Sequence, residues 1–365
     1  MVAGADSARP RLAGVLAAAL DTVQGHPGTL FPPSRRAAVV LVDGLGAAIV
    51  KRSGGYLRSL RARASRRMFG SFPSTTAVAL TSLCTGRLPA EHGILEYSVY
   101  DQEADRARNM LSGWGSRVEA APWGSAPTLF ERAGRQGVAA VAIGAERYRE
   151  TGFSEITLRG AEYRAAEDPE AAFRELHRFL SESGPGIAYV YLDGVDHAGH
   201  RYGAGSPEHL AQLDALDSAV AGFHCPGKSH VLLTADHGMV NVTAQLTLQD
   251  IPRAEERIHL VTGEPRMSVL VCEPGEDPGE VCGLLQPALG PAFEVIPTGE
   301  LWKSGLLGVP ADSGWMRRLG DLCVVAVDDH SAFYDRRTAS PGSFQMRGQH
   351  GGASSAELEV PLVQL

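Results

Sequence analysis

Five short polar segments of this chain carry side chains that can bind metal ions. They are Asp43-Gly44, Pro73–Thr76, Asp193–His200, Ala235–Gly238 and Gln349–Gly352. Asp and His together form the ligand set that a borderline-soft dication such as zinc takes in hydrolytic sites. Asp196 and His200 stand four residues apart, so on one helical turn both side chains would face the same way.

Each segment alone also has an ordinary structural explanation. Asp43-Gly44 after a strand is commonly a turn, and His350 in a glycine-rich loop is typical of a surface histidine. Asp236 and His237 can reach one metal ion together only if they follow a strand, because neighbours within a strand point to opposite faces. The metal interpretation therefore depends on all the segments occurring together and in this order.

The chain also has the elements needed to bring these segments together. Unbroken apolar runs, typical of parallel strands covered on both faces, occur at residues 37–42, 68–71, 138–143, 187–192 and 231–234. Helical stretches at 127–136, 168–182 and 206–223 lie between them, the last with Ser206 as N-cap and Pro207 at the first helical position. This alternation predicts an α/β fold with a mostly parallel central sheet and helices on both faces. Ligands of such sheets bind beyond the carboxyl ends of the strands, where the polar segments are expected.

The pattern of elements changes after about residue 247. Strand-like runs at 267–272 and 323–327 flank a short helical stretch at 280–289, and the loops are rich in Gly and Pro. We predict a small α+β cap insertion at residues 248–335. Residues 1–247 and 336–365 would then form the core domain, with a further strand at 358–363.

Composition excludes several classes of protein. A formal net charge of −8 disfavours nucleic acid as the partner, and no apolar run approaches the roughly 18–20 residues that span a bilayer. The cysteines are odd in number and form no C-x-x-C pair, which favours free thiols in a reducing compartment; they are Cys84, Cys225, Cys272, Cys282 and Cys323.

Arg9 and Arg11 before an apolar stretch at 12–20 resemble a weak signal peptide, but a short packed helix explains them as well. We expect a cytoplasmic protein.

The ordered motifs resemble those of the alkaline phosphatase superfamily. They are Asp43-Gly44, Thr75–Ala77 followed by Cys84–Gly86, Glu91–Ile94, Asp196–His200, Thr234–Met239 and His350-Gly351. Within the superfamily the chain is most similar to the type I phosphodiesterase/nucleotide pyrophosphatase branch, over roughly residues 37–247 and 345–363. A small phosphorylated substrate, such as a nucleotide, is the partner that this resemblance implies.

The resemblance implies a site with two zinc ions. One zinc would be bound by Asp43, Asp236 and His237, and the other by Asp196, His200 and His350. The same donors would also accept manganese or iron. The implied nucleophile is Thr76, ten residues before Gly86, and its hydroxyl is also an implied metal ligand; Ser74 and Thr75 are close enough to leave the register open.

Physical chemistry agrees with this implied mechanism. A threonine hydroxyl is a poor nucleophile until a metal ion lowers its pKa. Thr76 would stand at the N-terminus of a helix over 77–84, where N–H groups favour a phosphate oxygen. Two dications about 4 Å apart stabilise both the attacking and the leaving oxygen of an in-line displacement. The expected course is a phospho-threonine intermediate that water then hydrolyses.

Two departures from nucleotide pyrophosphatases concern the substrate. Tyr97 stands where those enzymes have an asparagine that helps to bind a phosphate oxygen, and Ala77–Ala79 replaces their Phe-Pro-Asn segment. A tyrosine hydroxyl can still donate a hydrogen bond, so Tyr97 is a candidate substrate-binding residue. Both departures weaken the case for a nucleotide more than the case for two-metal chemistry.

Several alternatives stay open from the sequence alone. A phosphomonoesterase or a phosphonate hydrolase could use the same site, and an inactive metal-binding relative would keep the fold without turnover. Sulfatase chemistry fits less well, because Cys84–Arg87 lacks the Pro or Ala of the sulfatase motif. No motif indicates the leaving group or the oligomeric state.

Overall fold

A seven-stranded sheet organises the larger part of the molecule, which a computed structural model describes at residues 11–26, 28–124 and 126–365. In spatial order its strands are β2 (Ser65–Phe69), β17 (Glu359–Gln364), β8 (Ser229–Thr234), β1 (Arg36–Val42), β7 (Gly186–Leu192), β5 (Ala139–Gly144) and β6 (Glu162–Ala165). Only β17 runs antiparallel to its neighbours; the other pairs are parallel. The predicted mostly parallel sheet is confirmed.

The central strands are buried because their residues are apolar on both faces. All seven residues of β1 are buried, and β1 pairs with β7 on one side and β8 on the other. The strand predicted at 68–71 lies earlier, in β2, because Arg66 and Arg67 pair with β17 while their side chains stay exposed. The edge strand β6 was not predicted, since its sequence Glu162–Ala165 is largely polar.

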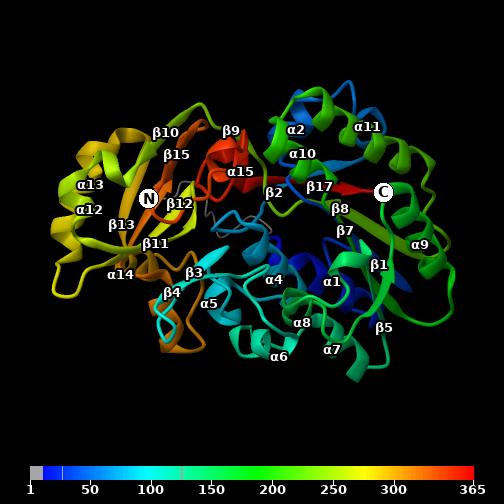
Figure 1. Cartoon of the computed structure of the whole chain (residues 1–365). Helices are drawn as coiled ribbons and strands as arrows, with labels where there is room; N and C mark the ends of the chain where they lie inside the picture. Colours follow the sequence, from blue (N-terminus) through cyan, green and yellow to red (C-terminus); the bar gives the residue numbers. More distant parts are fainter. Residues whose placement is uncertain (1–10, 27, 125) are drawn as a thin grey trace.

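Helices cover both faces of this sheet (Figure 1). One layer contains α1 (Ala13–Val23), α4 (Thr76–Thr85), α7 (Leu129–Arg135) and α8 (Gly152–Thr157). The other contains α2 (Ala47–Arg52), α9 (Pro169–Ser181), α10 (Gly194–Tyr202) and α11 (Pro207–Gly222). As predicted, the Ser206 side chain caps α11 by accepting a hydrogen bond from the His209 amide, and Pro207 is its first residue. Short helices fill the connections: α3 (Arg58–Arg61), α5 (Pro89–His92), α6 (Arg117–Ala120) and α15 (Ser355–Leu358).

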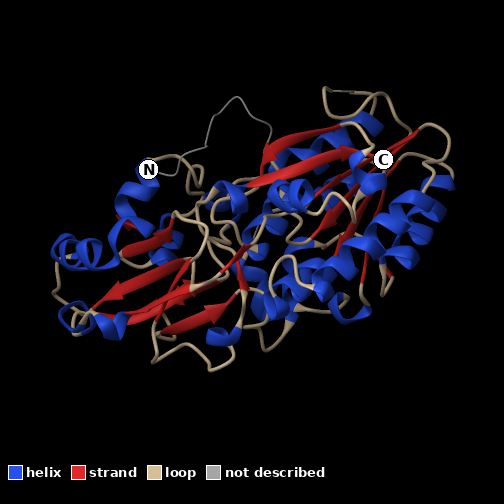
Figure 2. Ribbon diagram, turned by 90° about the horizontal axis from the view of Figure 1, so that it is seen from above, coloured by secondary structure: helices blue, strands red, loops and turns tan. Residues whose placement is uncertain are grey.

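A second, antiparallel sheet lies beside the first (Figure 2). Its order is β11 (Ile258–Glu264), β12 (Met267–Cys272), β14 (Leu322–Ala326) and β13 (Phe293–Pro297). The helix α13 (Pro278–Leu289) packs on it, and α12 (Pro252–Glu255) and α14 (Thr298–Lys303) flank it. The α+β character of the cap is therefore confirmed, while the domain boundaries at 247/248 and 335/336 stay predictions.

Three small strand pairs link these parts. β10 (Ala244–Thr247) pairs with β15 (Ser331–Tyr334), and β9 (Val240–Asn241) pairs with β16 (Gly348–Gln349). The hairpin β3 (Ser98–Asp101) and β4 (Arg106–Asn109) contacts the cap strand β11. The pairs β9–β16 and β10–β15 tie distant segments together near the site.

The N-terminal apolar stretch forms α1, which packs against β1, β7 and α4 with Leu16 and Leu20 fully buried. This agrees with the packed-helix interpretation; Arg9 lies outside the described residues, and the cytoplasmic location stays a prediction.

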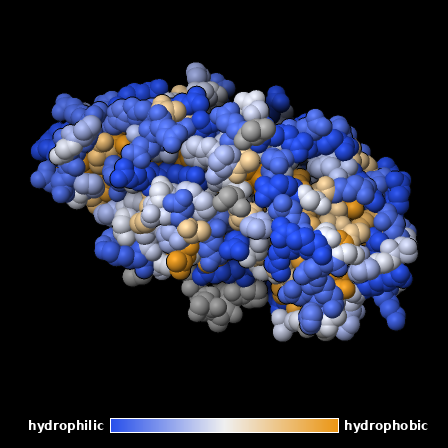
Figure 3. Space-filling model, turned by 90° about the horizontal axis from the view of Figure 1, so that it is seen from below, coloured by the Kyte–Doolittle hydropathy of each residue, from blue (hydrophilic) through white to orange (hydrophobic). Residues whose placement is uncertain are grey.

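Within the described ranges, none of the helices has both the length and the hydropathy that crossing a membrane requires. The described cysteines are free thiols, three of them buried. On the face shown in Figure 3, hydrophobic residues occur in small groups among hydrophilic ones.

Candidate metal centre

The carboxyl ends of three adjacent strands supply most of the predicted ligands. Asp43 directly follows β1, and Asp236 and His237 follow β8. Asp196 and His200 lie on α10, which begins two residues after β7 ends. Because β7, β1 and β8 are neighbours and parallel, their ends meet at one edge of the sheet. This is the edge where open α/β sheets bind ligands.

The first predicted ligand set forms one cluster. The His237 Nε2 atom lies 3.4 Å from Asp43 Oδ1 and 3.4 Å from Asp236 Oδ2. All three side chains are buried, and their ligand atoms lie within 4.8 Å of one another. Three donors so close together leave room for one shared metal ion.

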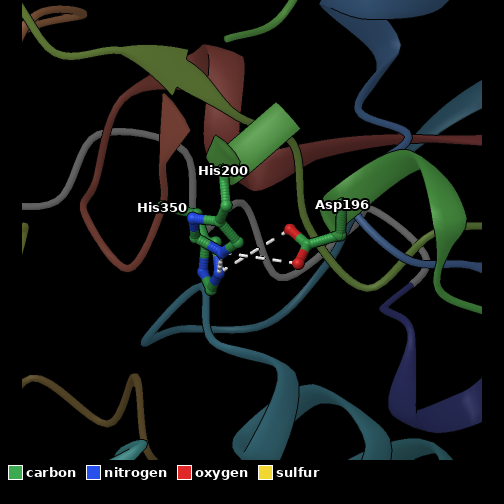
Figure 4. Close-up of side chains that lie close together, drawn as sticks. All are labelled: Asp196, His200 and His350. Carbon is green, nitrogen blue, oxygen red and sulfur yellow. Dashed lines mark hydrogen bonds and ion pairs between the residues drawn. The ribbon is translucent and has the colours of Figure 1, made fainter. Parts of the chain in front are cut away.

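The second ligand set forms an adjacent cluster, shown in Figure 4 with its side chains pointing toward one another. The His200 Nε2 atom lies 3.3 Å from Asp196 Oδ2 and 3.1 Å from His350 Nε2. The His350 ring stacks on the His237 ring, with centroids 3.7 Å apart and an interplanar angle of 16°. This stack brings the two clusters side by side, so one small anion could contact both.

A short strand pair and Ser74 place His350, which is far from the other ligands in sequence. β16 ends one residue before His350 and pairs with β9, which closely follows His237. Ser74 Oγ donates to Gly352 O and accepts from the Gly351 amide, so it clamps the loop that carries His350. The sequence does not predict this pairing, because two-residue strands leave no periodic pattern.

A main-chain carbonyl oxygen orients each of the three ligand imidazoles in the same way. In each, Nδ1 lies within 3.0 Å of a main-chain carbonyl oxygen: Gly238 for His237, Gly348 for His200 and Ser74 for His350. A carbonyl oxygen only accepts, so Nδ1 carries the proton and the Nε2 lone pair faces the cluster. Outer contacts of this kind orient histidine ligands in metal sites.

In Asp43 and Asp236 one carboxylate oxygen accepts hydrogen bonds and the other does not, and Asp196 likewise has one oxygen without a partner among the described residues. Asp236 Oδ1 accepts from the Gly44 and His237 amides, and Asp43 Oδ2 accepts from the Tyr191 hydroxyl. The other oxygens, Asp43 Oδ1, Asp236 Oδ2 and Asp196 Oδ1, are buried without a hydrogen-bond partner among the described residues. Buried oxygens of this kind are costly unless a cation or donor meets them.

The pKa shifts of the ligand side chains also indicate a site for cations. Burial, reinforced by Asp236 and Asp196, raises the pKa of Asp43 well above its usual value, and burial also raises the pKa of Asp236. Burial, together with the His237 and His200 rings, lowers the pKa of His350 well below its usual value. Negative charge is thus unfavourable here unless dications compensate it. The donor set, the free oxygens and the neutral imidazole all fit two zinc-like ions.

The structure separates the three candidate hydroxyls. Thr76 is the first residue of α4, and its Oγ1 lies 3.2 Å from His237 Nε2. The Ser74 hydroxyl is engaged with the His350 loop, and Thr75 Oγ1 is buried without a partner among the described residues. Thr76 is therefore the hydroxyl that meets the predicted ligands.

A cavity of about 730 Å³ opens around both clusters and reaches from the core to the cap. Thr76 and Tyr97 both line it, so the structure brings the predicted nucleophile and the predicted substrate-binding residue to one space. Its only described arginine or lysine is Arg147, which forms an ion pair with Asp193. His197, adjacent on α10, also lines the cavity and has a largely exposed side chain 3.6 Å from Asp193.

Two residues near the ligands escaped the sequence analysis. Tyr191 lies inside the apolar run of β7 and carries no motif, yet its hydroxyl contacts Asp43. Glu264 ends β11 in the cap, and its Oε2 lies 3.5 Å from His350 Nδ1. The alternation of β7 could have indicated that Tyr191 shares a face with Tyr189, but not what its hydroxyl meets.

Comparison with known proteins supports the resemblance seen in the sequence. The family model described as type I phosphodiesterase / nucleotide pyrophosphatase matches residues 37–353. Human ectonucleotide pyrophosphatase/phosphodiesterase family member 7 is 24% identical over 200 residues, which cover 49% of this chain and 41% of that protein. Venom phosphodiesterase 2 of Crotalus adamanteus is 26% identical over 196 residues, which cover 49% of this chain and 23% of that protein. The matches thus span less than half the length of these curated relatives.

Solved structures show the same fold. Phosphonoacetate hydrolase from Sinorhizobium meliloti 1021, in complex with phosphonoformate, has a TM-score of 0.69 at 19% identity and covers 92% of this chain and 91% of its own. Murine ectonucleotide pyrophosphatase/phosphodiesterase 5 has a TM-score of 0.65 at 15% identity, covering 89% and 87%. At these identities the likeness establishes the fold alone.

Proposed function

Because the chain belongs to the type I phosphodiesterase/nucleotide pyrophosphatase family, we propose that it is a metal-dependent hydrolase of phosphate diesters or phosphoanhydrides. One observation carries the proposal. Two sets of three ligands, whose free carboxylate oxygens and Nε2 atoms face one space, lie next to a hydroxyl at a helix N-terminus. In a site with a purely structural role, buried polar atoms such as these would have hydrogen-bond partners within the protein.

Thr76 would act as the nucleophile. Its hydroxyl oxygen attacks phosphorus as its proton passes to solvent, and the bond to the leaving oxygen breaks, with that oxygen keeping the electron pair and taking up a proton from solvent. The phospho-threonine is then hydrolysed by water, which restores the hydroxyl and releases the phosphoryl product. The two bound zinc ions would lower the pKa of the hydroxyl and neutralise charge on the phosphoryl oxygens.

Other residues of the chain would bind and orient the phosphoryl group. The first-turn N–H groups of α4 favour an anion beside Thr76. Tyr97, which also lines the cavity, would donate its hydroxyl to a phosphoryl oxygen. A murine relative supports the threonine assignment, since its threonine-to-alanine variant in complex with AMP is described as inactive.

The charge of the cavity favours a diester over a monoester. A diester carries one negative charge, whereas a monoester carries up to two and a phosphonocarboxylate adds a carboxylate. Among the described lining residues the only permanently cationic side chain is Arg147, which is already paired with Asp193. Phosphonate hydrolysis stays the second candidate, because the fold also matches a phosphonoacetate hydrolase.

Turnover of three substrates tests the proposal. Zinc-loaded protein should hydrolyse bis(p-nitrophenyl) phosphate with a kcat/KM at least about tenfold above that for p-nitrophenyl phosphate, a difference of about 1.4 kcal/mol. It should release no phosphate from phosphonoacetate. Preference for the monoester, or release of phosphate from phosphonoacetate, would replace the proposal with the corresponding alternative. No turnover of any substrate by protein that holds two metal ions would indicate an inactive relative.

A further inference from the structure

We propose that Tyr191 is a positioning residue for the first metal site, where its hydroxyl fixes which oxygen of Asp43 faces the ion. The inference rests on the two-metal site of the proposed function. Tyr191 lines the cavity, and the proposed function assigns it neither a substrate contact nor metal binding.

The contact itself is specific to one oxygen. The Tyr191 hydroxyl donates to Asp43 Oδ2, while Asp43 Oδ1 has no hydrogen-bond partner and lies 3.4 Å from His237 Nε2. A carboxylate that is held at one oxygen can rotate little, so it presents the other oxygen alone. Tyr191 therefore selects binding through Oδ1.

Asp43 differs from Asp236 in how it is held. Asp236 Oδ1 accepts from two main-chain amides, which come with the fold and cannot be removed by a side-chain substitution. The hydrogen bond that holds Asp43 Oδ2 comes from a side chain. Loss of that one hydroxyl would leave Oδ2 as a second buried oxygen without a partner beside the ion.

The tyrosine is in turn fixed by its surroundings. It lies on β7 opposite Leu41 of β1, and its ring is flanked by the rings of Tyr189 and Tyr148. The Tyr189 ring is nearly parallel, at 6.4 Å and 19°, and the Tyr148 ring is tilted, at 5.7 Å and 64°. The Tyr148 hydroxyl donates to Asp193, which fixes that ring as well. A donor with so little freedom can orient a ligand before the metal binds.

The same strand offers a matched control. Tyr189 lies two residues earlier on the same face of β7, and its buried hydroxyl has no partner among the described residues. Tyr191→Phe and Tyr189→Phe each delete one hydroxyl from stacked rings. Only the first deletion removes a contact to a ligand.

Competition with a chromophoric zinc chelator, which needs no turnover, measures the effect. In Tyr191→Phe, one of the two zinc ions should bind about 10–100-fold more weakly while the other is unchanged, because loss of an outer partner of a ligand typically has this effect. Tyr189→Phe should hold both ions as the unsubstituted protein does. In an Asp43→Ala background, adding Tyr191→Phe should cause no further loss, since the hydroxyl acts through Asp43. Thermal unfolding of the metal-free variants checks that they fold.

The outcomes separate this inference from the proposed function. Equal zinc affinity in Tyr191→Phe and the unsubstituted protein would overturn the positioning role alone. So would an equal loss in Tyr189→Phe, or a further loss in the Asp43→Ala background. An unsubstituted protein that binds fewer than two zinc ions would overturn the metal site and this inference with it.

Discussion

Replacing Thr76 by alanine removes the proposed nucleophile and little else. The side chain is 8% exposed, and the hydrogen bond that its hydroxyl makes runs to His237 Nε2 at 3.2 Å. The substitution leaves the six ligands in place, so the variant should bind metal as the unsubstituted protein does.

The structure allows the two effects of this substitution to be compared. Loss of one buried carbon contributes about 0.8 kcal/mol and loss of one hydrogen bond about 1 kcal/mol, so stability should fall by about 1–2 kcal/mol. For a chain of this size that lowers Tm by only a few degrees. Removal of the nucleophile should instead lower kcat by at least about 10³-fold, or about 4 kcal/mol of barrier. Unfolding therefore cannot account for the predicted loss of activity.

The assay is steady-state turnover of bis(p-nitrophenyl) phosphate, with metal content measured on the same samples. Thr76→Ser keeps a hydroxyl and should retain activity well above that of Thr76→Ala. Thr75→Val, the matched control, deletes a neighbouring hydroxyl that has no partner among the described residues and should behave as the unsubstituted protein. Activity of Thr76→Ala within tenfold of the unsubstituted protein would refute the assignment, and loss of activity in Thr75→Val alone would shift the register to Thr75.

Three further predictions concern the metal, the cap and acid stability. Removing metal with a chelator should lower the free energy of unfolding, by about 4 kcal/mol relative to protein with free zinc at 1,000 times its Kd. Adding zinc back should restore the stability. An unchanged Tm after chelation would contradict the metal site. Arg266→Met breaks a fully buried ion pair between the cap and Glu357 and should lower the free energy of unfolding by about 3–5 kcal/mol. Arg67→Met breaks an exposed pair and should lower it by less than about 1 kcal/mol. Similar losses for the two variants in urea unfolding would contradict this difference. Burial lowers the pKa of His92 from 6.5 to about 3, so the folded state keeps it neutral and its contribution to stability is lost as pH falls from 6.5 toward 3. Between pH 6.5 and 4.5 the free energy of unfolding should fall by about 2–3 kcal/mol more in the unsubstituted protein than in His92→Gln. Parallel pH profiles of the two proteins would contradict this prediction.

The sequence was most informative where burial is uniform. β1, β7 and β8 are apolar on both faces, which made their strands recognisable and placed the polar segments at their ends. Boundaries differed by one or a few residues, as for β2, where Arg66 and Arg67 belong to the strand although they are exposed. The edge strand β6 was missed because an exposed strand needs no apolar pattern.

The site was less accessible to sequence reasoning than the fold. The family resemblance implied the two ligand sets, but the β9–β16 pair that brings His350 to the others is too short to leave a pattern in the sequence. The choice among Ser74, Thr75 and Thr76 depends on side-chain directions at the start of α4, which spacing alone does not determine. Tyr191 received no role of its own, because nothing in an apolar run distinguishes a tyrosine whose hydroxyl contacts a ligand.

Anomalous diffraction at the zinc edge, from crystals grown with zinc, tests the central claim most directly. Two peaks should appear, one among Asp43, Asp236 and His237 and the other among Asp196, His200 and His350, with the Thr76 hydroxyl beside them. A single peak, or peaks bound by other residues, would contradict the two-metal site on which the proposed function depends.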